Sequence, residues 1–201
     1  MLTVRQIDRF WNDRQYEKLF GALTEFRPEG TFRFSIDGGR AVPAAAMALI
    51  RLEELSHAHV PLYGRLVRAL LASQNHNDGG WGDPVVTALC LRALMNGRGH
   101  GVAVERGLDF LAELQKPEGI WPDVPIRRMA GDAYASAFIL YQLGDKSLFR
   151  QAVRFDDAVE WFTRNDRKLD AESRRWWGHA GTRCRMWAAP VVSSDVLELV
   201  N

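Results

Sequence analysis

The sequence predicts an all-α protein built from repeated helical hairpins, arranged as an α/α toroid or part of one. Three kinds of segment predict this class: glycine-aromatic turns, amphipathic segments before them, and strongly apolar segments between them. The turns read RPEGTF at 27–32, HNDGGW at 76–81 and KPEGIW at 116–121. We therefore expect a unit that repeats roughly every 40–50 residues, the range of helical solenoids and toroids.

The segments before the turns predict amphipathic helices. RLVRALLASQ (65–74) and RGLDFLAELQ (106–115) both begin with Arg, end with Gln and carry apolar residues at the fifth and sixth places. A third copy, DAVEWFTRND (157–166), keeps the apolar spacing but has Asp at both ends. Apolar residues at helical spacing are typical of a helix that packs one face on a core and exposes the other.

The alternating segments predict helices with neighbours on most sides. PAAAMALIRL (43–52), VVTALCLRAL (85–94) and SAFILYQL (136–143) are apolar nearly all round, so their pattern does not show which residues face a cavity. The clear repeats cover about 41–177 of a single domain, 1–201. An additional outer helix is expected within 7–25, and the start of a further unit within 178–201, ending in a capped helix SSDVLELV.

The composition fits a soluble protein. It is 47% hydrophobic and 25% charged, and the net charge of +1 gives no general reason to expect nucleic acid or a membrane surface. Cys90 and Cys184 suggest no disulfide framework, which fits a reducing compartment. The N-terminus has no secretory apolar region, and the longest uncharged apolar run, 41–50, is about half a membrane span. We expect a cytoplasmic protein without a membrane span.

The turns and the helices before them resemble a known superfamily. The segment 106–121 resembles the QW motif of the squalene–hopene and oxidosqualene cyclases, and 74–82 resembles a second copy, in a form also seen in protein prenyltransferase β subunits. The resemblance covers roughly 40–180 and implies an α/α toroid in which Gln bonds the start of a neighbouring helix and Trp packs against it. The residues given this structural role are Gln74, Gly80, Trp81, Gln115, Gly119 and Trp121.

The catalytic motifs of these families are not found in the sequence. Class II terpenoid cyclases use an Asp-x-Asp-Asp acid, which does not occur here. Prenyltransferases place zinc on an Asp-x-Cys pair, and neither cysteine has Asp two residues before it. The resemblance therefore implies a shortened toroid that binds an apolar, isoprenoid-like small molecule, and it leaves open whether the protein is an enzyme.

Two acids are candidates for chemistry. Asp83 precedes Pro84, which is typical of a helix start, and the same side chain is placed to bind a cation or polarise a substrate. Asp123 follows the other Trp turn forty residues later, so we place it at the position equivalent to Asp83. Asp132 lies in or just before an apolar helix, where desolvation would raise its pKa and let it donate a proton. Helix capping is the alternative role for each of these acids.

Arginines beside aromatic residues are the candidates for ligand binding. Guanidinium groups suit phosphate or carboxylate oxygens, and aromatic rings suit a flat or isoprenoid body or developing positive charge, although the same residues also form ordinary stacked packing. The candidates are Tyr134, Trp176, Trp177, Arg127, Arg128 and Arg183.

The sequence predicts no metal and no cofactor. Asp156, Asp157 and Glu160 match the spacing by which class I isoprenoid synthases bind magnesium, but the repeat places Asp157 on the water-facing side of an outer helix. The histidines, including His179, have no spacing typical of a zinc site.

Two other functions and one assembly stay open. A partial helical array is also typical of a non-catalytic module that binds a protein or peptide. A carbohydrate-active (α/α)-barrel enzyme would need two carboxyl groups about 5–10 Å apart, for which Asp83 and Asp132 are the best pair. An unclosed arc exposes apolar surface, so we expect self-association, with two chains completing one ring.

Overall fold

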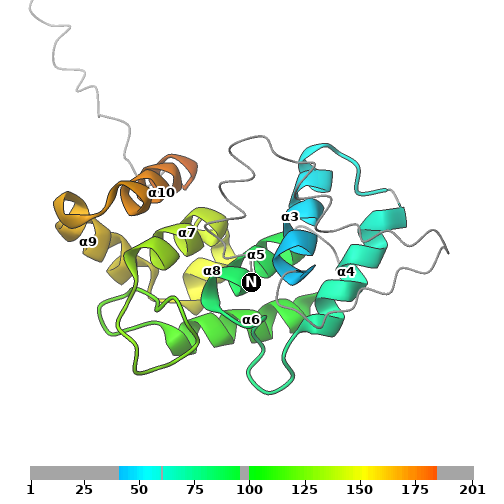
Figure 1. Ribbon diagram of the computed structural model, residues 1–201, viewed down its shortest axis with the longest axis horizontal. Coiled ribbons are helices and arrows are strands. Elements are labelled where there is room, and N and C mark those ends of the chain that lie inside the picture. Colours follow the sequence, from blue (N-terminus) through cyan, green and yellow to red (C-terminus); the bar gives the residue numbers. More distant parts are fainter. Residues whose placement is uncertain (1–40, 60, 96–99, 185–201) are drawn as a thin grey trace, which may run out of the picture.

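The computed structural model describes residues 41–59, 61–95 and 100–184, and the regular elements among these residues are all helices, with no strand (Figure 1). The predicted all-α class is confirmed. The elements are α3 (Ala41–Glu54), α4 (Pro61–Ser73), α5 (Pro84–Met95), α6 (Gly101–Leu114), α7 (Ala133–Leu143), α8 (Ser147–Ala152), α9 (Phe155–Asn165), the short 3₁₀ helix η1 (Asp166–Lys168) and α10 (Ala171–Arg183).

All six helices predicted within this part of the chain are present. Three elements were not predicted: the short α8, η1 and the last inner helix, α10, which crosses the boundary expected at about 177 between the clear repeats and a further unit. The expected helices within 7–25 and 193–200, and the first glycine-aromatic turn, lie outside the described residues. No helix in the described ranges is long and apolar enough to cross a membrane.

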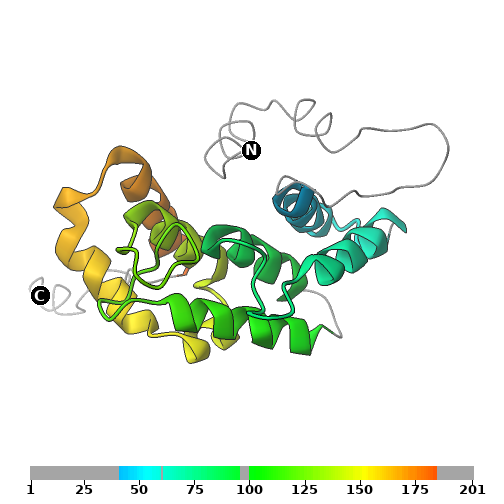
Figure 2. The same cartoon turned by 60° about the horizontal axis from the view of Figure 1, so that its bottom comes forward.

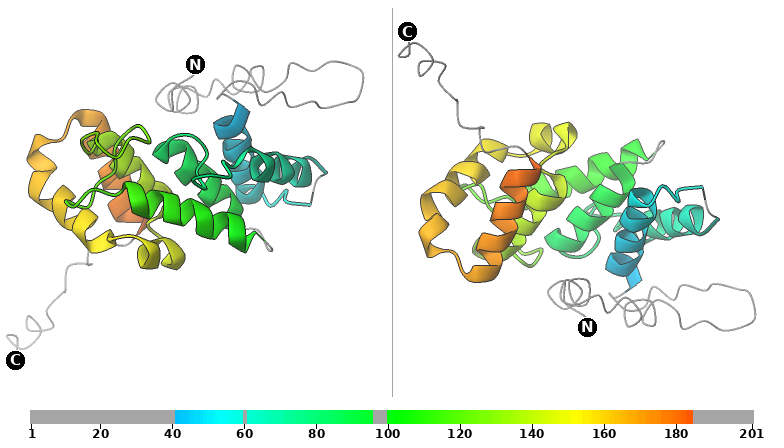
Figure 3. Two further views of the ribbon diagram at one scale, coloured as in Figure 1. Left: turned by 90° about the horizontal axis from the view of Figure 1, so that it is seen from below. Right: turned by 90° about the horizontal axis from the view of Figure 1, so that it is seen from above.

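Four helices form an inner row. α3, α5, α7 and α10 pack side by side in chain order, as Figure 3 shows. Arg92 Nη1 at the end of α5 donates to Gln142 O at the end of α7, 3.3 Å away. Arg183 at the end of α10 pairs with Asp145, just beyond the end of α7, at 3.6 Å. The C-terminal ends of α5, α7 and α10 therefore lie along one edge of the row, and their N-terminal ends lie along the other.

The remaining helices pack against this row. α4 packs on α3, and α6 packs on α5 and on α8. Figure 2 shows α6 running alongside the row and α9 at the end of the molecule. The ring of Phe162 on α9 stacks on Trp177 of α10, with centroids 4.7 Å apart. The described chain thus has inner and outer helices in alternation; whether they belong to a toroid stays a prediction.

Burial explains the two sequence patterns. Every residue of α5 from Pro84 to Leu94 is buried, because the helix has α3, α7 and α6 around it. α9 buries only Phe155, Ala158 and Phe162, which lie three and four residues apart on one face. The nearly uniform apolar pattern and the one-sided pattern therefore correspond to inner and outer positions.

The two described Trp turns make matching bonds. Gln115 Nε2 donates to Gly119 O (2.7 Å) and to Arg154 O at the start of α9 (3.0 Å). Gln74 Nε2 likewise donates to Gly79 O (2.7 Å) and to Ala103 O in the first turn of α6 (2.8 Å). Each Gln thus joins the end of one outer helix to the start of the next.

The tryptophans of these turns tie each turn to both flanking helices. Trp81 and Trp121 donate from Nε1 to Leu70 O and Leu111 O, each at 2.8 Å. Their backbone N–H groups donate to hydroxyls at the start of the next inner helix, Thr87 at 2.9 Å and Ser136 at 2.8 Å.

Among the glycines of the first described turn, Gly79 rather than the predicted motif residue Gly80 has the same conformation and contacts as Gly119. Gly79 and Gly119 both have positive φ, 80° and 94°. A Cβ on Gly79 would lie 2.5 Å from Arg106 O, and one on Gly119 would lie 2.5 Å from Ala158 N. At both positions the turn touches the backbone of the next outer helix, and Gly80 instead lies against the ring of Phe110.

The connection between α9 and α10 lacks this arrangement. Asp stands where the other copies have Gln, and the turn carbonyls are bound from the next inner helix instead. Arg174 Nη2 donates to Asp166 O (3.2 Å), Arg167 O (3.5 Å) and Leu169 O (3.0 Å).

Candidate functional site

Aspartates cap the inner helices along one edge of the row. Asp83 Oδ1 accepts from Val86 N, and Asp132 Oδ1 accepts from Ala135 N, both at 2.7 Å. Asp170 caps α10 in the same way. The predicted helix-start role of Asp83 and Asp132 is therefore observed, and because α5 and α7 are neighbours, both carboxyls lie at the same edge.

The predicted equivalence of Asp83 and Asp123 is wrong. Asp132 has the cap position that corresponds to Asp83, because a longer connection, 122–132, precedes α7. Asp123 is an exposed residue of that connection. Burial raises the pKa of Asp83 above its ordinary value of 3.8, and the negative charge of Asp123 raises it to a smaller extent. The hydrogen bonds that Asp83 accepts from the backbone of Val86 and Val85 act in the opposite direction and lower this pKa.

An aromatic face lies at the contact of α7 and α10. We use this name for Tyr134, Phe138, Tyr141, Trp176 and His179. Trp176 meets the ring of Tyr141 at 4.8 Å and that of Phe138, edge-on, at 5.1 Å. Its Nε1 is buried and has no hydrogen-bond partner among the described residues. Tyr141 is half-buried and His179 is exposed, so the face reaches the surface at these two rings.

Two predicted ligand residues belong to this face and the others do not. Tyr134 and Trp176 are part of it. Trp177 is 2% exposed and packs on α9, on another side of α10. Arg127 and Arg128 are exposed in the connection that enters α7, where Arg127 pairs with Glu113.

Arg183 lies at the opposite end of α7 from Arg127 and Arg128. Helix α7 has 11 residues, which makes it roughly 16 Å long. The guanidinium carbon of Arg183 stands 5.1 Å from the ring centroid of Tyr141, at the border of the aromatic face. The structure therefore does not gather the three arginines into one site.

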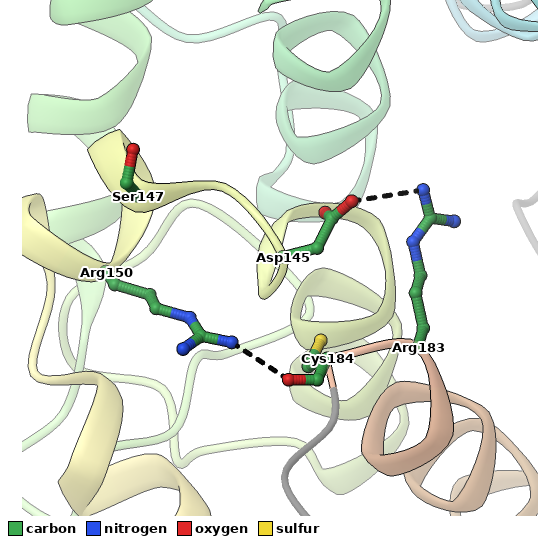
Figure 4. Close-up of a pocket in the computed structure, with 5 residues that line it drawn as sticks. All are labelled: Asp145, Ser147, Arg150, Arg183 and Cys184. Atoms are coloured by element: carbon green, nitrogen blue, oxygen red, sulfur yellow. Dashed lines mark hydrogen bonds and ion pairs between the residues drawn. The ribbon is translucent and has the colours of Figure 1, made fainter.

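A pocket opens beside Arg183, at the C-terminal edge of the inner row. It has a volume of about 290 Å³, and Figure 4 shows the residues that line it: Asp145, Ser147, Arg150, Arg183 and Cys184. Sequence reasoning missed all of these except Arg183. They come from the end of α7, from α8 and from the end of α10. No local sequence pattern predicts that α8 lies close to the end of α10.

The cysteines and the acidic motif add no further site. Cys90 is fully buried, and burial raises its thiol pKa well above the ordinary range. Burial, with a smaller effect of Asp145, raises the pKa of Cys184 to about 11, so this thiol is protonated at neutral pH. Asp156, Asp157 and Glu160 are exposed on α9, as the repeat predicted for Asp157. No three metal-ligating side chains converge within the described residues.

Comparison with known proteins gives one partial relative. No protein-family model matches the chain, and no solved structure matches it. The chain is 34% identical over 95 residues to the drimenyl diphosphate synthase of Streptantibioticus cattleyicolor. The match covers 44% of this chain but only 16% of that enzyme. It supports a terpenoid-cyclase-like, all-helical fold at a coarse level.

Proposed function

We propose that this protein is a terpenoid-cyclase-like toroid that binds an apolar, isoprenoid-like small molecule on the aromatic face of α7 and α10. The observation that carries the proposal is the partial similarity to an enzyme named for a terpenoid diphosphate. The two Gln–Trp turns, proposed as QW repeats, add support because they bond successive outer helices in the same way. The aromatic face supplies π surfaces suited to an unsaturated chain.

The test uses farnesol, an uncharged isoprenoid, in a tryptophan fluorescence titration. We expect Tyr141→Leu to weaken binding roughly tenfold, because this half-buried ring joins Trp176 to the surface. Trp161→Leu is the matched control, since Trp161 is also half-buried but lies on α9. Equal affinity in both variants would refute the aromatic face as the binding surface.

If the protein is also an enzyme, we propose that Asp132 is the acid that donates a proton to the bound isoprenoid. Asp132→Asn keeps an oxygen that accepts from Ala135 N but removes the proton donor. With farnesyl diphosphate as substrate, loss of any cyclised product at unchanged stability would support the acid role, and full turnover would refute it. The same measurement on Asp83→Asn shows whether the N-cap carboxyl of the neighbouring helix α5 contributes to turnover. Binding without turnover in the unaltered protein would favour a protein that binds the isoprenoid without catalysis.

Self-association is the proposed assembly. The described inner row presents α3 and α10 at its two ends, and a second copy is the simplest way to complete a ring with two-fold symmetry. Native mass spectrometry measures assembly and retained ligand together. A dimer that releases a small molecule on denaturation is expected, and a ligand-free monomer would refute the shared ring.

A further inference from the structure

We propose that the pocket at the C-terminal edge of the inner row is a phosphate-class anion site, with Arg150 and Arg183 as its main ligands. The site lies at the opposite end of α7 from Asp132. The proposal does not depend on the apolar ligand, because it is tested with an inorganic anion.

The size of the pocket limits its occupant. A volume of about 290 Å³ falls just below the range of about 300–1,000 Å³ of pockets that enclose drug-sized ligands. A phosphate or diphosphate group fits such a volume, and Ser147, which also lines the pocket, carries a hydroxyl that can donate.

Arg150 is fixed in place by the ends of two inner helices. Its Nε donates to Gly144 O (2.5 Å) and its Nη2 donates to Cys184 O (3.2 Å), which are the C-cap carbonyls of α7 and α10. The guanidinium also lies 4.6 Å from the ring centroid of Phe155. These contacts orient the group before a ligand arrives, which lowers the entropy lost on binding.

Arg183 is held less completely. Its Nη2 stands 3.6 Å from Asp145 Oδ2, and its Nε is buried without a hydrogen-bond partner among the described residues. A buried donor without an acceptor is unfavourable, so the guanidinium of Arg183 is less fully satisfied than that of Arg150. Figure 4 shows Arg183 and Arg150 on either side of Asp145.

The local charge favours an anion. The pocket is lined by two guanidinium groups, Arg150 and Arg183, and by one carboxylate, Asp145, so two positive charges face one negative charge and the formal charge of the lining is +1. The C-terminal ends of α7 and α10 each contribute roughly −0.5, but their C-cap carbonyls already accept hydrogen bonds from Arg150. Arginine forks favour phosphoryl oxygens, which they bind in pairs.

The experiment is calorimetric titration of the full chain with inorganic diphosphate, at fixed ionic strength and with a chelator to remove divalent metals. We expect saturable binding that Arg183→Gln weakens about tenfold or more, because a charge-assisted contact is lost. Asp145→Asn should tighten binding about threefold, because it removes the carboxylate that repels the anion. Arg164→Gln is the control, since Arg164 is exposed on α9 and pairs with Glu160.

The opposite effects of the two pocket variants make the test decisive even where one of them folds poorly. A purely structural role for the arginines would make Asp145→Asn weaken binding or leave it unchanged. No saturable binding to the unaltered protein, equal affinity in Arg183→Gln, or weaker affinity in Asp145→Asn would each overturn the proposal.

A parallel titration with farnesyl diphosphate identifies the source of the phosphoryl group. Binding that is tighter than that of inorganic diphosphate, and still sensitive to Arg183→Gln, would assign the pocket to the head of an isoprenoid ligand. Equal affinities with the same sensitivity would assign it to a free anion. If Arg183→Gln does not change the affinity for farnesyl diphosphate, the pocket is not the site that binds its diphosphate group. This result would not contradict binding of the isoprenoid chain on the aromatic face.

Discussion

At the scale of single residues, backbone conformation decides which glycines hold the turns. Gly79, Gly82 and Gly119 all have positive φ, which disfavours any side chain. Only Gly79 and Gly119 also touch the backbone of the next outer helix, while a Cβ on Gly82 would meet nothing within 4 Å. The three positions therefore separate the cost of backbone strain from the cost of a steric clash.

Gly119→Ala is expected to destabilise the protein by roughly 2–5 kcal/mol, because strain and clash add. The added Cβ would lie 2.5 Å from Ala158 N, so α9 must move. Gly82→Ala carries strain alone and is expected to cost about 1–2 kcal/mol. Urea denaturation of both variants measures the difference. Equal losses in the two variants would show that the contact with α9 is not tight.

Asp83 is expected to make stability depend on pH. Burial raises its pKa in the folded protein. Its stabilising contribution is therefore fully present below the unfolded pKa and is lost as pH rises through the higher folded pKa. Asp83→Asn keeps an N-cap oxygen but does not titrate. The variant should thus gain stability relative to the unaltered protein as pH rises through this window.

Urea midpoints measured at about pH 4 and about pH 7 check this expectation. Asp109→Asn, on the exposed face of α6, is the control for a general change in charge. A stability difference between Asp83→Asn and the unaltered protein that is the same at both pH values would contradict the assignment.

At the scale of the elements, a buried glutamine links the outer helices. Gln115 is 8% exposed. Beyond its two donated bonds, its Oε1 accepts from Arg154 N at 2.8 Å. All three bonds end on the backbone, so the link depends on the amide group and not on the identity of its partners. A change of this group should loosen α9 from the end of α6.

Gln115→Glu tests this link with little change of shape. The carboxylate still accepts from Arg154 N but cannot donate, so Gly119 O and Arg154 O lose their donor and face a negative charge. We expect a loss of roughly 2–4 kcal/mol in the free energy of unfolding. Gln151→Glu, at an exposed position on α8, should change stability by less than about 0.5 kcal/mol. A similarly small loss of unfolding free energy in Gln115→Glu would contradict the proposed link between the outer helices.

The sequence predicted the elements better than it predicted the site, because helix patterns are local. The one-sided pattern of 157–166 and the uniform pattern of 85–94 each follow from the neighbours of a single helix. The pocket instead depends on how the C-terminal ends of α7 and α10 lie beside α8. The pairing of Asp83 with Asp123 failed for a related reason: spacing after a Trp turn does not reveal a longer connection before α7.

At the scale of the whole molecule, burial is concentrated in the middle of the inner row. The buried residues form one core cluster that runs from α3 to α10, so the hairpins share a core. Within it, α5 and α7 have inner neighbours on both sides, whereas α3 and α10 stand at the ends of the described row. In a stacked array of this kind, each unit is stabilised mainly by its nearest neighbours.

This arrangement predicts a gradient of local stability that hydrogen-exchange mass spectrometry can measure. We expect the amides of α5 and α7 to exchange only through global unfolding, and those of α8 and α9 to exchange faster through local opening. α8 has only Phe149 as a buried residue, and α9 is buried along one face, so opening either one exposes little apolar surface. In Gln115→Glu the protection of α9 should fall further, while that of α5 stays unchanged, because the lost bonds join α9 to the turn after α6. Uniform protection across all helices would instead mean that the described chain unfolds as one unit and that the inner row is no more stable than its outer layer.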